Sequence, residues 1–135
     1  MTFEHPEGEQ ALDDIRKWAL TAARAAASKK GDDITVLDVG GVLAITDVFV
    51  ITSAPNGRLV KTIVEEVEKQ VKADGGPSPL SIEGLHEAQW VLLDYGDFVV
   101  HVFLDEVRRY YDLERLWSDV PRIPFSDDVR AAAGE

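Results

Sequence analysis

Six aspartates are the residues of this chain best able to support metal-dependent chemistry. A nucleotidyl-transfer site needs a Gly-Ser turn followed by Asp-x-Asp on a strand, so that two carboxylates project together onto one metal ion. The chain contains no Gly-Ser pair and no Asp-x-Asp. A nucleotide-binding or nucleotidyltransferase-like enzyme is therefore the alternative rather than the main interpretation. The six aspartates are Asp32, Asp33, Asp38, Asp47, Asp94 and Asp97.

The remaining candidates for chemistry are few. There are no cysteines, which excludes disulfides, thiolate metal sites and cysteine nucleophiles. His5, His86 and His101 are too scattered to form a zinc site by spacing. His101 has no serine or threonine placed beside it as a nucleophile, and we expect it to be partly buried and paired with Asp94. We predict no catalytic residue, no metal and no cofactor.

The net charge of −11 restricts the partners. Binding phosphates requires a local excess of lysine and arginine, but no basic run exceeds two residues, and Lys29-Lys30 is followed, after Gly31, by Asp32-Asp33. Direct nucleic-acid binding is therefore not expected. An acidic surface suits a basic protein partner, although composition alone favours the alternative that the charge only maintains solubility. No apolar stretch is long enough to span a bilayer, and the acidic N-terminus lacks a secretion signal, so we expect a cytoplasmic protein.

Hydrophobic periodicity predicts one α/β domain, with a single mixed β-sheet flanked by helices. We expect a flexible leader at residues 1–10, the domain at 11–119 and a polar tail at 120–135. Either Ser53 or Asn56 could cap the second helix. The expected elements are a helix at 9–30, strands at 34–39 and 48–52, a helix at 58–73, a short strand near 80–82, strands at 89–95 and 98–104, and a helix at 105–117.

The last predicted helix carries arginines and aromatic residues. At its start, Arg108 and Arg109 are expected to form ion pairs with the acidic residues of the same helix, Asp105, Glu106 and Asp112. The aromatic residues fall at helical spacing, which is more typical of a core than of a ligand site. They are Tyr110, Tyr111 and Trp117.

The most informative segment is a β-hairpin whose turn is formed by Gly96 and Asp97. A glycine in the first central position fits a two-residue type II′ turn, which fixes the register of the two strands. Trp90 then pairs with Phe103, and Asp94 with Val99. One face of the hairpin carries no charged group and suits the core: Val91, Leu93, Tyr95, Phe98, Val100 and Val102.

The other face of the hairpin is apolar but includes two polar residues, Asp94 and His101. Burying these two without partners would cost several kcal/mol, whereas an aromatic anchor beside polar groups is typical of a protein-binding patch. A covering helix is the competing explanation, and periodicity does not decide between the two. The face comprises Trp90, Leu92, Asp94, Val99, His101 and Phe103.

Taken together, the motifs resemble the ribosomal silencing factor family, also called RsfS or Iojap-like proteins. They occur in the family's order and at its spacing over roughly residues 11–119. The matching stretches are Asp33-Ile-Thr-Val-Leu-Asp-Val, Ile45-Thr-Asp-Val-Phe-Val-Ile-Thr-Ser, Glu83-Gly, Trp90-Val-Leu-Leu-Asp-Tyr-Gly-Asp-Phe-Val-Val-His-Val-Phe and Arg109-Tyr-Tyr-Asp-Leu-Glu-Arg-Leu-Trp.

The resemblance implies a fold like that of nucleotidyltransferases, without their catalytic activity. It also implies binding to ribosomal protein L-fourteen of the large ribosomal subunit, which sterically blocks subunit joining and represses translation under nutrient limitation. Some members of the family form homodimers when free. The family's contact motif falls on Trp90, Asp94, Tyr95 and Asp97 in this chain, and Glu83 on the adjoining loop is a weaker candidate.

Overall fold

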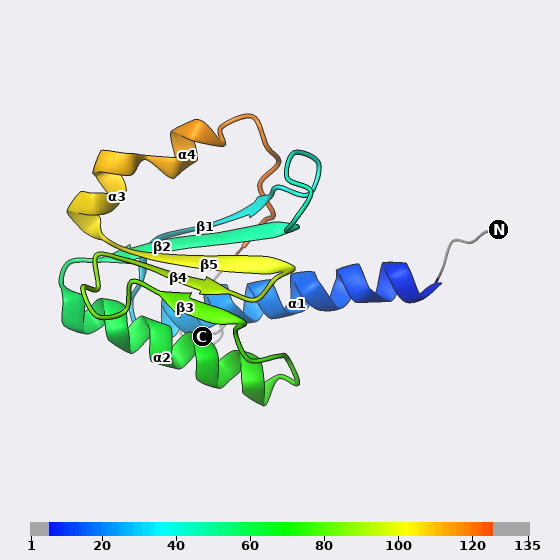
Figure 1. Cartoon of the computed structure of the whole chain (residues 1–135), viewed down its shortest axis with the longest axis horizontal. Helices are drawn as coiled ribbons and strands as arrows, with labels where there is room; N and C mark the ends of the chain where they lie inside the picture. Colours follow the sequence, from blue (N-terminus) through cyan, green and yellow to red (C-terminus); the bar gives the residue numbers. More distant parts are fainter. Residues whose placement is uncertain (1–5, 126–135) are drawn as a thin grey trace, which may run out of the picture.

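A five-stranded mixed sheet with helices on both faces forms the body of the molecule, as the sequence predicts (Figure 1). The structure, a computed structural model, describes residues 6–125, and side chains from residue 11 onward. The strands lie in the order β1-β2-β5-β4-β3, and only β2 and β5 are parallel. The elements are α1 (Pro6–Ser28), β1 (Asp32–Asp38), β2 (Val48–Ala54), α2 (Gly57–Ala73), β3 (Ser81–Glu83), β4 (Trp90–Asp94), β5 (Phe98–Leu104), α3 (Asp105–Tyr111) and α4 (Leu113–Leu116).

The main core lies between the sheet and the two long helices, α1 and α2, which cover one face (Figure 1). Alanines on the inner side of α1, such as Ala19 and Ala22, are fully buried and let this helix approach the sheet and α2 closely. On α2 the inward residues recur at helical spacing from Val60 to Val71 and are also buried. Asn56 caps this helix, because its side-chain oxygen accepts a hydrogen bond of 2.8 Å from the Leu59 N–H.

Both ends of the predicted domain need correction where the structure describes them. Helix α1 begins at Pro6, inside the stretch predicted as a flexible leader, and a proline fits the first turn of a helix because its missing N–H needs no partner there. The start of the predicted tail lies along β1: Val120 is buried, Arg122 forms a β-bridge with Leu37, and Ile123 N–H donates to the Val36 carbonyl. Residues 1–5 and 126–135 lie outside the described part of the chain.

The predicted helix at residues 105–117 is two short helices rather than one. Asp112 separates α3 from α4 and adopts a left-handed conformation with φ of 51°. Aspartate tolerates this conformation better than most residues do. The break redirects the chain, so that Val107 on α3 and both Leu113 and Trp117 after the break pack against the second face of the sheet.

Candidate functional site

The β4–β5 hairpin has the predicted register. Trp90 lies opposite Phe103 and Asp94 opposite Val99, and Tyr95 N–H donates to the Phe98 carbonyl at 3.0 Å across the turn. Gly96 has a φ of +86°, the positive value that the first central position of a type II′ turn requires. The uncharged face of the hairpin is buried in the main core under α1 and α2, as predicted.

The second face of the hairpin is covered over β5 and partly open over β4. Val99 and Phe103 are buried in a smaller core together with Phe49 and Leu37. On β4, however, Trp90, Leu92 and Asp94 remain half-exposed. Helices therefore cover one part of this face and leave the other part open, because α3 and α4 are too short to extend across the whole sheet (Figure 1).

Trp90 lies at the border between the covered and open parts of this face. Its ring stacks on Phe103 and lies beside Tyr111, with ring centroids 4.9 Å apart in both pairs. Its indole N–H donates to His101 Nδ1 at 3.1 Å. This hydrogen bond replaces the predicted pairing of His101 with Asp94. Because a neutral imidazole has one donor and one acceptor nitrogen, the proton of His101 belongs on Nε2. Burial lowers the pKa of His101 to about 4, so the ring is neutral at pH 7.

The acidic candidates lie around the open part of the face. Asp94 accepts a hydrogen bond of 2.8 Å from Gly96 N–H, which stabilises the hairpin turn. Asp97 is exposed at the tip, and its main-chain carbonyl accepts from Asp47 N–H, so the tip is tied to the β1–β2 loop. Glu83 is exposed on β3, opposite Leu92. Glu83, Asp94 and Trp90 thus share one face, with Asp97 at its end.

Tyr95 does not share this face. Its side chain is only 5% exposed and stacks on Phe98, with ring centroids 4.4 Å apart, in the core beneath the sheet. Burial raises the pKa of its phenol well above the usual value. The motif-based assignment of Tyr95 to the contact surface is therefore corrected, because residues 94 and 95 point to opposite faces of the strand.

Gly84 explains how Glu83 comes to lie beside Trp90. Its φ is +82°, and a Cβ at this position would collide with the Trp90 main-chain carbonyl oxygen. Only glycine therefore lets the end of β3 pass so close to the start of β4. A shallow depression of about 340 Å³ results, lined by Glu83, Gly84, Trp90 and Leu92.

Two exposed aliphatic residues that sequence reasoning missed stand beside this surface. Ile45, in the β1–β2 loop, is 84% exposed, and Leu80, just before β3, is 76% exposed. Together with Leu92 they line a groove of about 430 Å³ on the second face of the sheet. Periodicity could not identify them because both lie outside regular strands. The sequence signal that could have identified them is a single large aliphatic residue in a stretch rich in turn-forming residues.

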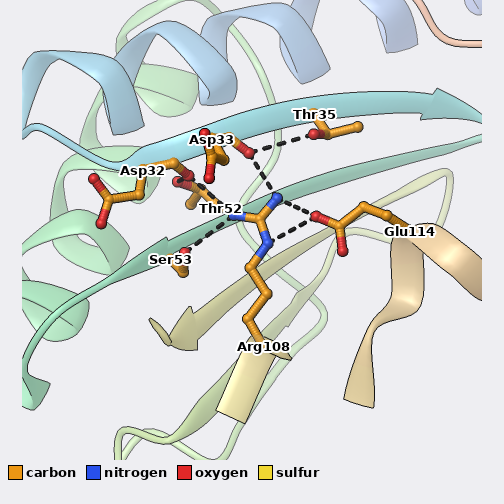
Figure 2. Close-up of polar contacts among 7 residues, drawn as sticks. All are labelled: Asp32, Asp33, Thr35, Thr52, Ser53, Arg108 and Glu114. Carbon is orange, nitrogen blue, oxygen red and sulfur yellow. Dashed lines mark hydrogen bonds and ion pairs between the residues drawn. The ribbon is translucent and has the colours of Figure 1, made fainter. Parts of the chain in front are cut away.

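A buried arginine fixes α3 and α4 to the sheet at the opposite end of this face (Figure 2). Arg108 is 8% exposed, and its guanidinium donates to the Asp32 and Asp33 main-chain carbonyls, to Ser53 Oγ and to the carboxylate of Glu114. These partners replace the predicted ion pairs with acidic residues of its own helix. The tyrosines predicted for the core are instead exposed, Tyr110 most of all, at 81%.

The described residues also bear on metal binding and membrane insertion. Among the side chains of residues 11–125, no group of three or more histidines and carboxylates is arranged to hold a metal ion. No helix between residues 6 and 125 is both long and apolar enough to cross a membrane.

Comparison with known proteins identifies similar chains. Residues 12–135 match the family model described as "Ribosomal silencing factor during starvation". The RsfS protein of Bacillus subtilis is 41% identical over 100 residues, which cover 74% of this chain and 84% of that protein. A mouse protein named mitochondrial assembly of ribosomal large subunit protein 1 is 35% identical over 89 residues, 64% of this chain and 39% of its own length. A crystal structure from Chromobacterium violaceum superposes with a TM-score of 0.73 at 33% identity, covering 83% of this chain and 92% of that one.

Proposed function

Since the chain belongs to the ribosomal silencing factor family, whose members regulate translation at the ribosome, we propose that it binds ribosomal protein L-fourteen on the large ribosomal subunit. Binding there would sterically block the small subunit from joining. No chemical step is required of the chain. Repression then depends only on affinity and on the space that the bound domain occupies.

The observation that carries this proposal is the partly open second face of the sheet. Trp90 and Leu92 are half-exposed there, next to the carboxylates of Glu83 and Asp94. A large aromatic side chain in a shallow apolar depression with polar groups at the edge is typical of an interface hot spot. Stacking on Phe103 and the hydrogen bond to His101 hold the Trp90 ring in place before a partner arrives, which lowers the entropic cost of binding.

The charge of the chain supports a protein contact over an RNA contact. At −11, the domain is repelled by ribosomal RNA as a whole and attracted by the basic surface of a ribosomal protein. The carboxylates beside Trp90 therefore favour docking on protein within a surface that is otherwise largely RNA. We expect the association rate to fall as salt is added.

Co-sedimentation with isolated large ribosomal subunits tests the proposal, with two tryptophan variants as a matched pair. Trp90 and Trp18 are both half-buried, and each indole N–H donates one hydrogen bond, but they lie on opposite faces of the sheet. Trp90→Ala should cost about 2 to 4 kcal/mol of binding free energy, as a central hot spot does. Trp18→Ala should lose folding stability yet bind as wild type does. Equal binding by both variants would contradict the assigned surface.

The blocking step needs its own measurement. Wild-type protein added to large subunits before small subunits should lower the fraction of joined ribosomes in a sucrose gradient, in proportion to its occupancy. Isolated protein L-fourteen, added in excess, should relieve the effect by competing for the same face. If joining is unaffected at full occupancy, the protein binds the large subunit without blocking it.

A further inference from the structure

The groove beside Trp90 has apolar walls that are open to solvent. Ile45 and Leu80 stand at its sides, and Leu92, Phe49 and Val99 form much of its floor. An unpartnered groove of about 430 Å³ with these walls suits a long side chain that carries an apolar stem. The stem would bury the exposed surface of Ile45 and Leu80.

The charged groups lining the groove are all acidic. They are Glu83 and Asp94, and neither forms an ion pair with the side chains described, those of residues 11–125. Glu83 lies opposite Leu92, and Asp94 is two residues further along the same strand, so both side chains project from the same face. Diagonal neighbours of this kind are close enough for one long side chain to reach both. One cationic head placed between these two positions could therefore contact both carboxylates.

Two buried polar atoms of the groove have no hydrogen-bond partner among the described residues. They are His101 Nε2 and Thr46 Oγ1, and both residues line the groove although they are only 5% and 6% exposed. A buried polar atom that stays unpaired destabilises the protein, and a hydrogen-bonding partner would remove that cost. Nε2 carries the proton of the neutral ring and can donate to a carbonyl, whereas the threonine hydroxyl can also accept from an N–H. The unpaired atoms indicate that the group bound in the groove has hydrogen-bonding atoms as well as an apolar part.

We propose that this groove receives an arginine side chain from the basic ribosomal partner, with its stem against Leu92 and its guanidinium between Glu83 and Asp94. Arginine matches the groove better than lysine does, because its planar head offers five N–H donors to two carboxylates and a hydroxyl. The guest's main-chain carbonyl is a suitable acceptor for His101 Nε2. His101 stays neutral and does not repel the cation. The source of the arginine rests on the proposed function.

A charge-removing double variant tests this pocket on large subunits. Glu83→Gln/Asp94→Asn should weaken binding about tenfold or more and flatten the salt dependence, because two charge-assisted contacts are lost. Asparagine keeps an oxygen that can accept from Gly96 N–H, and Glu83→Gln alone, at an exposed position, should weaken binding severalfold with no risk to folding. Asp13→Asn/Glu65→Gln is the matched control, because it removes the same charge from exposed positions on α1 and α2. Wild-type affinity and salt dependence in the groove variant would overturn the inference.

A second experiment separates the pocket from the ribosome. Blocked Gly-Arg-Gly, Gly-Lys-Gly and Gly-citrulline-Gly peptides are titrated into the full chain while amide shifts are followed by NMR. We expect saturable shifts at Leu80, Glu83, Leu92 and Asp94 with the arginine peptide, much weaker ones with lysine, and none with citrulline. These shifts should be absent from Glu83→Gln/Asp94→Asn. If the arginine peptide causes these shifts while the wild-type protein fails to sediment with large subunits, the arginine pocket is supported and the proposed function is wrong. Equal shifts with all three peptides, or none with arginine, would refute the pocket.

Discussion

Replacing Arg108 with methionine should detach α3 and α4 from the sheet. The guanidinium connects Glu114 to the start of β1 and the end of β2, through bonds of 3.0 Å to the Asp32 carbonyl and Ser53 Oγ and 2.6 Å to the Asp33 carbonyl (Figure 2). Methionine keeps much of the stem's packing volume but provides no donor. The carboxylate of Glu114 and the two main-chain carbonyls would then lose their hydrogen-bond donor and would need hydration by water instead.

The expected loss of stability follows from the burial of the pair. Removing one partner of a buried ion pair costs about 3 to 5 kcal/mol, because the other charge is left uncompensated. The side chain of Glu114 is 22% exposed, so it can be partly rehydrated once the arginine is gone. We therefore expect a value near the lower limit, about 3 kcal/mol. Glu114→Gln should cost less, about 1 to 2 kcal/mol, because its amide oxygen can still accept.

Urea denaturation of the two single variants and the double variant gives these values by linear extrapolation. The double-variant cycle should show a coupling free energy of about 1 kcal/mol or more between Arg108 and Glu114. Hydrogen exchange should speed up first over α3 and α4, before the sheet opens. Arg109→Met is the matched control, since Arg109 is exposed and should change stability by less than about 0.5 kcal/mol. A similarly small loss for Arg108→Met would show that the network does not hold the helices.

Two further predictions concern buried groups on opposite faces of the sheet. His101 has a pKa of about 4 when folded and about 6.5 when unfolded. Below pH 6.5 the imidazole of His101 is therefore protonated in the unfolded chain but stays neutral in the folded chain. The free energy of unfolding should fall by up to about 3 kcal/mol between pH 7 and pH 4. His101→Phe should lose this part of the pH dependence in denaturant titrations. Tyr95→Phe removes a buried hydroxyl that has no partner among the described residues. It should leave stability unchanged or raise it by about 1 kcal/mol, and large-subunit binding should not change.

The hairpin was predictable because its signals are local. A glycine in the turn fixed the register, and alternation along two strands fixed the faces. Tyr95 is instructive, because alternation placed it on the core face while the family motif placed it on the contact surface. The structure agrees with alternation. Neighbours in a sequence motif need not share a face when the motif lies on a strand.

The contacts of the last two helices were not predictable from local sequence. Arg108 has acidic neighbours on its own helix, but its main-chain partners lie 75 and 76 residues away on β1. The apolar spacing continues through Asp112, yet the helix breaks there, and Leu113 and Trp117 after the break pack against the sheet. Ile45 and Leu80 line the same groove, but this could not be predicted without the order of the strands in the sheet. Contacts between distant segments leave no periodic signal.

The incomplete cover over the second face leaves Trp90 both packed against the domain and partly open to solvent. A longer final helix would have buried Trp90 and Leu92, and with them Asp94, at a cost of several kcal/mol for an unpaired carboxylate. The break at Asp112 and the attachment of α3 by Arg108 limit the cover to β1, β2 and β5. Trp90 is thereby held from one side by Phe103 and Tyr111 and left open on the other. Its substitution should therefore reduce both stability and binding, and the Trp18 comparison is needed to separate the two effects.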